Sequence, residues 1–174
     1  DILRPGTDPD EVAARLDRLV ADLRRDGATV VIFNGPDIGM TPVLKSIRGK
    51  VAIFNENIRW LAGRHDAVVA DMWSLRELSD PRMWASDRLH FSPIGHHTIA
   101  RRTLAALNVE NDLEPLKPEP LPSVSWRQAR VEDIGWAREH LVPWVLRRLR
   151  NESSGDGVQP KRPGFDRVPP VSED

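Results

Sequence analysis

Apolar residues near the start of the chain recur at helical spacing. One face would carry Val12, Leu16, Leu19, Val20 and Leu23. Thr7 or Asp8 can cap such a helix, and Pro9 stands where a first helical turn tolerates proline. Gly27 ends the run. The pattern predicts an amphipathic helix that leads into the first strand.

Two short apolar runs, Thr29 to Phe33 and Ala67 to Ala70, show no alternation with polar residues. Such runs are typical of strands covered on both faces in a parallel sheet. Between them, Lys50 to Gly63 repeats the helical spacing, with Val51, Ile53, Phe54, Ile58 and Leu61 turned inward. This helix–strand alternation predicts an α/β fold with right-handed crossovers. Two strands of this kind also need neighbours in the sheet, which this chain does not show.

The C-terminal third has a different pattern. Residues 111–123 are rich in proline and form a linker or surface strap. Residues 124–150 predict one long helix, or two interrupted near Pro143, with apolar positions proposed as buried at Trp126, Ile134, Leu141, Val145 and Leu149. Residues 151–174 have too little apolar content to fold alone.

Composition narrows the classes of function. The 174 residues suit one domain, and a formal net charge of −1 gives no overall basic field for nucleic acid. No apolar stretch is long enough for stable membrane insertion, and cysteine is absent, which excludes disulfides and thiolate nucleophiles. The chain opens on Asp1 without an initiator Met, so we expect its natural N-terminus to lie upstream and leave its compartment open.

The segment SDRLHFSPIGHHTIA, residues 86–100, concentrates candidate chemistry. Ser92 as N-cap and Pro93 as first helical residue predict a loop that feeds a helix. His96 and His97 would point about 100° apart on that helix and so cannot easily share an ion with His90 and Asp87. We therefore expect no metal and no cofactor, and assign His96 and His97 to the helix surface.

Asp87 and His90 fit another chemistry. A carboxylate three residues before a histidine in a loop can fold back and hold one imidazole nitrogen, which a general base requires. The pair follows a predicted strand and precedes a capped helix. That context places it at the carboxyl end of the sheet, where α/β proteins bind ligands.

This segment resembles the last conserved block of the SGNH hydrolases, also called the GDSL lipase/esterase family. The resemblance implies that His90 is the catalytic base and Asp87 its partner, in a flavodoxin-like three-layer α/β/α fold. Residues 1–39 are similar to the segment after the family's G-x-N-D block, with Asp1 as the last residue of that block. Residues 1–110 would then be the C-terminal part of the hydrolase domain, and the helix over 124–150 resembles an extension of actinobacterial members.

The motif that carries the family's nucleophilic serine is not found in this sequence. In the family this serine lies in a G-D-S block, and a glycine and an asparagine of two further blocks help form the oxyanion hole. None of the ten serines of this chain stands in a G-D-S or G-x-S-x-G setting. We expect the nucleophile and the missing strands to belong to an N-terminal segment of the same protein, and the 174 residues alone to be inactive on a small ester substrate.

Other residues have a functional and a structural interpretation. Asn34 and Asp37 could line the substrate cleft or only stabilise a Gly-Pro turn, and Trp84 could floor an acyl pocket or belong to the core. Arg88 could meet an anionic substrate or be solvated. Two alternatives to an enzyme stay open: an inactive binding module of the same fold, and a basic, Trp-containing C-terminal helix that binds a membrane surface or another macromolecule.

Overall fold

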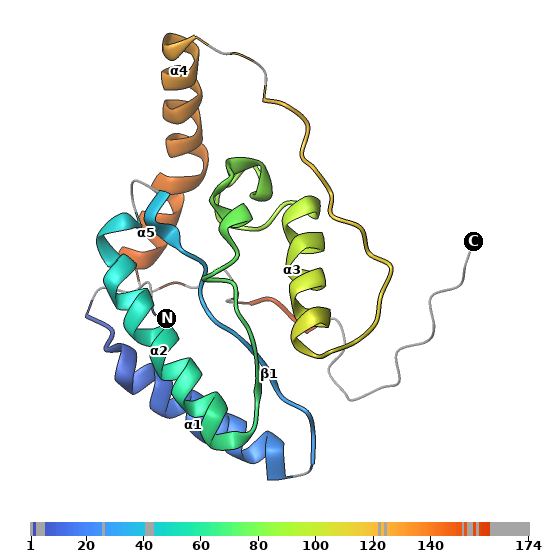
Figure 1. The fold of residues 1–174 in the computed structure, drawn as a ribbon. Helices are drawn as coiled ribbons and strands as arrows, with labels where there is room; N and C mark the ends of the chain where they lie inside the picture. Colours follow the sequence, from blue (N-terminus) through green and yellow to red (C-terminus); the bar gives the residue numbers. More distant parts are fainter. Residues whose placement is uncertain are drawn as a thin grey trace. The chain divides into compact units, whose positions relative to one another are not determined.

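Two parallel strands lie at the centre of the N-terminal part of the computed structural model (Figure 1). β1 (Val31–Phe33) pairs with β2 (Val68–Ala70) in the register Val31 to Val68 and Phe33 to Ala70. Among the described residues, which are 2, 6–25, 27–40, 44–121, 123, 125–150, 152, 155 and 157–160, these strands pair only with each other. Helices and a parallel strand pair agree with the predicted α/β class.

Two helices pack together against one face of this pair. They are α1 (Pro9–Arg25) and α2 (Arg48–His65), which lie side by side in Figure 1. Their shared core consists of Val20, Ile32, Ile58, Leu61 and Ala62. The apolar face of α1 is narrower than predicted, since Leu19 and Leu23 are about half exposed, and Ile53 of α2 also faces solvent.

A third helix, α3 (Pro93–Ala106), contacts β2 and lies across the strands from α1 and α2 in Figure 1. Ile99 of α3 packs with Leu75, Leu78 and Met83 in a second core cluster. Four short 3-10 turns complete this part of the chain: η1 (Ile38–Met40), η2 (Lys45–Ile47), η3 (Arg76–Ser79) and η4 (Pro81–Met83). The segment between β2 and α3 thereby has a core of its own.

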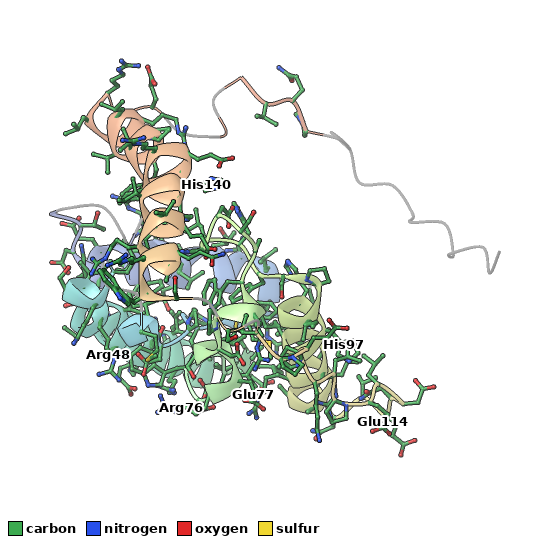
Figure 2. All side chains as sticks on the ribbon, turned by 90° about the horizontal axis from the view of Figure 1, so that it is seen from above. Arg48, Arg76, Glu77, His97, Glu114 and His140 are labelled. Carbon is green, nitrogen blue, oxygen red and sulfur yellow. The ribbon has the colours of Figure 1, made fainter. Side chains whose placement is uncertain are left out.

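The proline-rich segment after α3 follows the surface of that helix. Residues 109–121 form no helix or strand. Their carbonyl groups accept hydrogen bonds from the ring of His97 (to Glu114, 2.8 Å) and from Nε of Arg101 (to Leu113, 2.7 Å). Figure 2 labels His97 and Glu114. Through these two hydrogen bonds the strap, residues 109–121, contacts His97 and Arg101 of α3.

Residues 1–121 and 122–174 are two compact units. In the second unit α4 (Trp126–Trp136), a π-helical turn η5 (Ala137–Leu141) and α5 (Val142–Leu149) follow one another without a break. The Ser125 hydroxyl caps α4 by accepting from the amide of Gln128 at 3.3 Å. A wider π turn just before Pro143 accommodates a residue that cannot donate a backbone hydrogen bond.

The predicted buried face of this C-terminal helix is wrong in most of its positions. The structure exposes Trp126, Ile134, Val145 and Leu149, and only Leu141 is partly buried. The apolar spacing is present, but within residues 122–174 no described element covers this face. Asp1 and most of the predicted tail, 151–174, lie outside the described residues. No helix in the described ranges is long and apolar enough to cross a bilayer.

Candidate functional site

Asp87 and His90 lie in a small antiparallel hairpin between η4 and α3. Trp84 and Phe91 form its bridge, and the amide of Ala85 donates to the carbonyl of His90 at 2.8 Å. The tip is a turn in which the amide of Arg88 donates to Ala85 O at 2.9 Å. Arg88 adopts a left-handed backbone (φ 57°), which lets the chain reverse within four residues.

The Asp87 carboxylate organises this turn from inside. One oxygen, Oδ1, accepts from the amides of Leu89 and His90 at 2.9 and 3.0 Å. The other, Oδ2, lies 2.5 Å from Nδ1 of His90. Burial opposes ionisation of the carboxyl, but the hydrogen bonds from His90 and Leu89 outweigh it and lower the pKa of Asp87 to about 2. The carboxylate is therefore charged at neutral pH.

The two imidazole nitrogens of His90 have different surroundings: Nδ1 contacts Asp87, and the ring is otherwise largely exposed to solvent. Its side chain is 75 % exposed. Nδ1 faces Asp87, and in the described part of the chain no group is hydrogen-bonded to Nε2. An imidazole oriented by a carboxylate at Nδ1 presents Nε2 to solvent, which is the arrangement in which histidine accepts a proton from a hydroxyl.

The N-terminus of α3 fixes the base of the hairpin. The Ser92 hydroxyl donates to the carbonyl of Arg82 at 2.7 Å and accepts from the amide of Gly95 at 3.2 Å. The amide of Ser92 donates to the carbonyl of Met83 at 2.9 Å. A Cβ atom on Gly95 would lie 2.1 Å from that same carbonyl oxygen, so only glycine allows this close approach. The two strands of the hairpin and the first turn of α3 therefore pack together around the backbone of Met83.

Aromatic rings continue from the hairpin to α3. The rings of Trp84 and Phe91 lie 4.5 Å apart, and His96 meets Phe91 edge-on at 5.9 Å. Trp84 also donates from Nε1 to the carbonyl of Leu78 at 2.8 Å. His96 is exposed and is not brought to His90. In the part of the chain that the structure describes, no group of three or more His, Asp or Glu side chains is arranged to hold a metal.

A surface cavity of about 510 Å³ opens beside the hairpin. Its lining includes two of the predicted substrate-binding residues, Asp37 and Trp84, and also Arg88. The other lining residues are Met40, Leu78, Ser79, Pro81, Ala85 and Ser86. Asp87 and His90 are not among them, but the lining includes Ser86 and Arg88, which precede and follow Asp87.

Asp37 is the acidic residue in the lining of this cavity. Its carboxylate accepts from Nε and Nη2 of Arg48 at 2.6 and 2.7 Å, and from Nη1 of Arg76 at 2.9 Å. The hydrogen bonds from Arg48 are the main reason that the pKa of Asp37 lies well below its usual range, and they outweigh its partial burial. Figure 2 labels the two arginines, which come from α2 and η3. Asp37 thus joins three segments and is ionised at neutral pH.

From the sequence, Asn34 is either a residue of the substrate cleft or a support of the turn. It is fully buried, and its amide nitrogen donates to Asp71 at 2.6 Å. Its oxygen accepts from the amides of Met72 and Trp73 at 2.7 and 3.1 Å. Every polar atom of the carboxamide thus serves the fold, joining the end of β1 to the segment after β2. The geometry favours the structural interpretation of Asn34, and the residue does not line the cavity.

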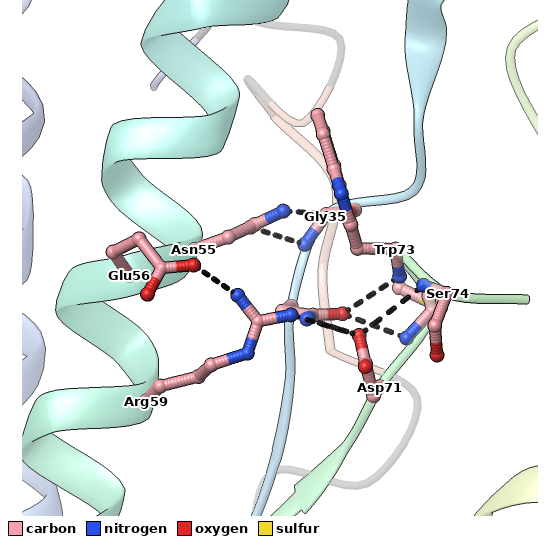
Figure 3. A network of polar contacts seen from close by, with 9 residues as sticks. Gly35, Asn55, Glu56, Arg59, Asp71, Trp73 and Ser74 are labelled. Atoms are coloured by element: carbon pink, nitrogen blue, oxygen red, sulfur yellow. Dashed lines mark hydrogen bonds and ion pairs between the residues drawn. The ribbon is translucent and has the colours of Figure 1, made fainter.

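A second buried asparagine, Asn55, was not predicted from the sequence. Asn55 of α2 accepts from the amide of Gly35 and donates to its carbonyl, both at 2.8 Å (Figure 3). The signal was present in the sequence: Asn55 stands four residues after Val51 and three before Ile58, on the buried face of the helix. Figure 3 also shows Arg59 bridging Glu56 and Asp71.

Comparison with known proteins gives one finding. A protein-family model described as the GDSL-like lipase/acylhydrolase family matches residues 1–98, which include the whole hairpin. No curated protein and no solved structure matches the chain.

Proposed function

Because the chain belongs to the GDSL-like lipase/acylhydrolase family, we propose that it supplies the general base of a serine ester hydrolase. One observation carries the proposal: the Asp87 carboxylate holds Nδ1 of His90 at 2.5 Å, while Nε2 faces solvent. In this assignment His90 is the base and Asp87 orients it. The three-layer α/β/α fold, with further strands in the parallel sheet, belongs to the same proposal.

The proposed reaction has two halves. A serine hydroxyl attacks the ester carbonyl carbon, its proton moves to Nε2 of His90, and Asp87 stabilises the imidazolium that forms. The imidazolium then protonates the leaving alcohol, and an acyl-serine ester remains. In the second half His90 takes a proton from water, which attacks the acyl carbon, and returns it to the serine as the carboxylic acid leaves.

The attacking serine is proposed to come from outside these 174 residues. Among the described serines none is hydrogen-bonded to His90. Ser92 caps α3, and Ser79 donates to the carbonyl of Arg76. Ser86, four residues before His90, lines the cavity, and no hydrogen bond joins it to the imidazole. The same upstream segment would add strands beside β1 and β2. Phe33 of β1 is 45 % exposed, and added structure could cover it. A two-stranded sheet is marginal by itself, so such a completion is physically reasonable.

The cavity beside the hairpin is the proposed site for one end of the substrate. Leu78, Pro81, Trp84 and Ala85 give it an apolar wall, and apolar walls with a few polar groups are typical of small-molecule sites. Trp84 is held by two contacts, to Phe91 and to Leu78, so its ring is a rigid surface for an acyl chain or an alcohol. Asp37 and Arg88 provide the polar rim.

Two assays on the 174-residue chain test the proposal. With p-nitrophenyl acetate we expect no turnover above that of the His90→Ala variant. With a fluorophosphonate probe, which labels activated serines, we expect no His90-dependent labelling of any serine of this chain. Addition of the upstream segment as a second chain, or fusion to it, is expected to restore both turnover and labelling, with the label on the added segment.

Three outcomes would contradict the assignment. Turnover by the isolated chain that survives His90→Ala would remove His90 from the reaction. A His90-dependent label on a serine within the 174 residues would place the nucleophile in this chain. A complete protein that binds ester analogues without turnover would indicate a binding module.

A further inference from the structure

The C-terminal helix exposes a continuous aliphatic face. Val142, Val145, Leu146 and Leu149 follow the spacing i, i+3, i+4, i+7 and are 48, 39, 46 and 75 % exposed. This spacing places them on one face of α5. Val131 and Ile134 of α4 add exposed apolar surface about two to three turns earlier in the same uninterrupted helix.

Arginine flanks this face. Residues 126–150 contain six arginines and three acidic residues, so the helix is cationic. Residues 1–121 contain 16 basic and 18 acidic side chains, so the excess of positive charge is confined to the helix rather than shared by the whole chain. Arg147 lies on the side of α5 away from these apolar positions, and Arg150 follows the last of them just past the end of the helix. An aliphatic face next to a cationic one is typical of helices that lie in a membrane interface.

We propose that α4 and α5 bind the surface of an anionic phospholipid bilayer, with Val142, Val145, Leu146 and Leu149 at the boundary between headgroups and acyl chains. The arginines then contact lipid phosphates. The helix would lie in the interface, since no described helix is long and apolar enough to span the bilayer.

Charge decides between this occupant and a second copy of the chain. Two copies that joined their aliphatic faces would bring two cationic helices together, and like charges repel. An anionic bilayer offers apolar burial and opposite charge at once, and each basic residue near such a surface adds to the attraction. The inference does not depend on the proposed hydrolase activity.

The test uses the whole chain and two kinds of vesicle. Co-sedimentation is measured with vesicles of phosphatidylcholine alone and with vesicles that contain one third phosphatidylglycerol. We expect binding at least tenfold stronger to the anionic vesicles, and a loss of most of this preference in high salt because ions screen the charges.

Variants separate the two faces of the helix. Val145→Asp with Leu149→Asp should weaken binding to anionic vesicles at least tenfold, and Arg147→Glu with Arg150→Glu should abolish the preference for phosphatidylglycerol. Leu121→Asp is the matched control, because Leu121 is also exposed (61 %) but lies in the strap. It should bind as the parent does. Far-ultraviolet circular dichroism verifies that each variant keeps its helix content.

Three results would overturn the proposal. Equal or absent binding to both vesicle types would exclude an anionic bilayer. A dimer by light scattering that Val145→Asp converts to a monomer would assign the face to a second copy. Amide exchange at α5 that is slow in the chain without vesicles, and fast after Val145→Asp, would assign it to another part of the same chain.

Discussion

Asp87 has two separable tasks. Oδ1 accepts from the amides of Leu89 and His90 and shapes the turn, whereas Oδ2 faces Nδ1 of His90. An asparagine keeps the first task, since its oxygen still accepts from both amides, but it loses the negative charge that would stabilise the imidazolium in the proposed reaction. The turn and the base can therefore be tested apart.

We expect Asp87→Asn to leave the fold of the chain unchanged while it lowers kcat of the completed hydrolase by roughly 10⁴-fold, as loss of the triad carboxylate does elsewhere. Kinetics on the reconstituted enzyme measure the second effect, and amide chemical shifts of Leu89 and His90 measure the first. A variant with full activity would show that Asp87 has no part in orienting the base.

The lowered pKa of Asp87 gives a pH dependence with a defined sign. The pKa in the folded chain, about 2, lies below the ordinary value, so the ionised carboxylate stabilises the fold at pH values above the ordinary pKa. That contribution is lost as the pH falls from about 4 towards 2. A carboxyl-carbon NMR titration should show Asp87 still ionised at pH 3, and a midpoint near 4 would contradict the hydrogen-bond network.

At position 95 the hairpin leaves no room for any side chain. We expect Gly95→Ala to lower the free energy of unfolding by about 1–3 kcal/mol, because its Cβ would overlap the backbone oxygen of Met83. Gly63→Ala in α2 is the control: nothing lies within 4 Å of its Cβ position, and it should stabilise the chain by about 0.5–1 kcal/mol. Urea denaturation measures both, and equal effects of the two substitutions would refute the close contact.

At the scale of elements, polar side chains hold the edge of the sheet together. Asn34 joins the end of β1 to the segment after β2, and Asn55 joins α2 to Gly35. Asp37 joins the loop after β1 to α2 and η3 through Arg48 and Arg76. The cavity beside the hairpin therefore has a wall fixed by contacts between elements far apart in the sequence.

Asp37→Asn should loosen this wall. We expect a loss of about 1–3 kcal/mol in the free energy of unfolding at pH 6, since hydrogen bonds to a charged group are replaced by weaker ones. The pKa of Asp37 is lowered in the fold, so the difference between parent and variant should shrink as the pH falls below about 4. Denaturation at pH 6 and pH 3 measures it, and a difference that grows in acid would have the wrong sign.

Elements defined by local signals were predictable. α3 begins where Ser92 and Pro93 indicate, because a cap acts within three residues, and the Asp87 and His90 contact spans a separation of three. The partners of Asp37 lie 11 and 39 residues away, so no pattern along the chain identifies them. The apolar face of α5 was predicted as buried because spacing reports amphipathicity and not what covers the face.

At the scale of the whole molecule, the proposed upstream segment has an energetic consequence. A segment that completes the sheet binds the folded chain and not the unfolded one, so at 100 times its Kd it should add about 2.7 kcal/mol to stability. For a chain of this size that is a rise of roughly 5–11 °C in Tm. Differential scanning fluorimetry with increasing segment measures it, and restored activity at an unchanged Tm would show that the segment does not complete the fold.

The compactness of the hairpin also bears on the order in which the site forms. The contact between Asp87 and His90 closes a loop of three residues, and its chain-entropy cost is small. Closure of loops even three times longer takes about 10–100 ns, far less than the pairing of distant strands. The contact between Asp87 and His90 thus forms early and almost autonomously during folding. If the proposed upstream segment delivers the nucleophile, its docking comes last, and that long-range step sets the rate at which activity appears.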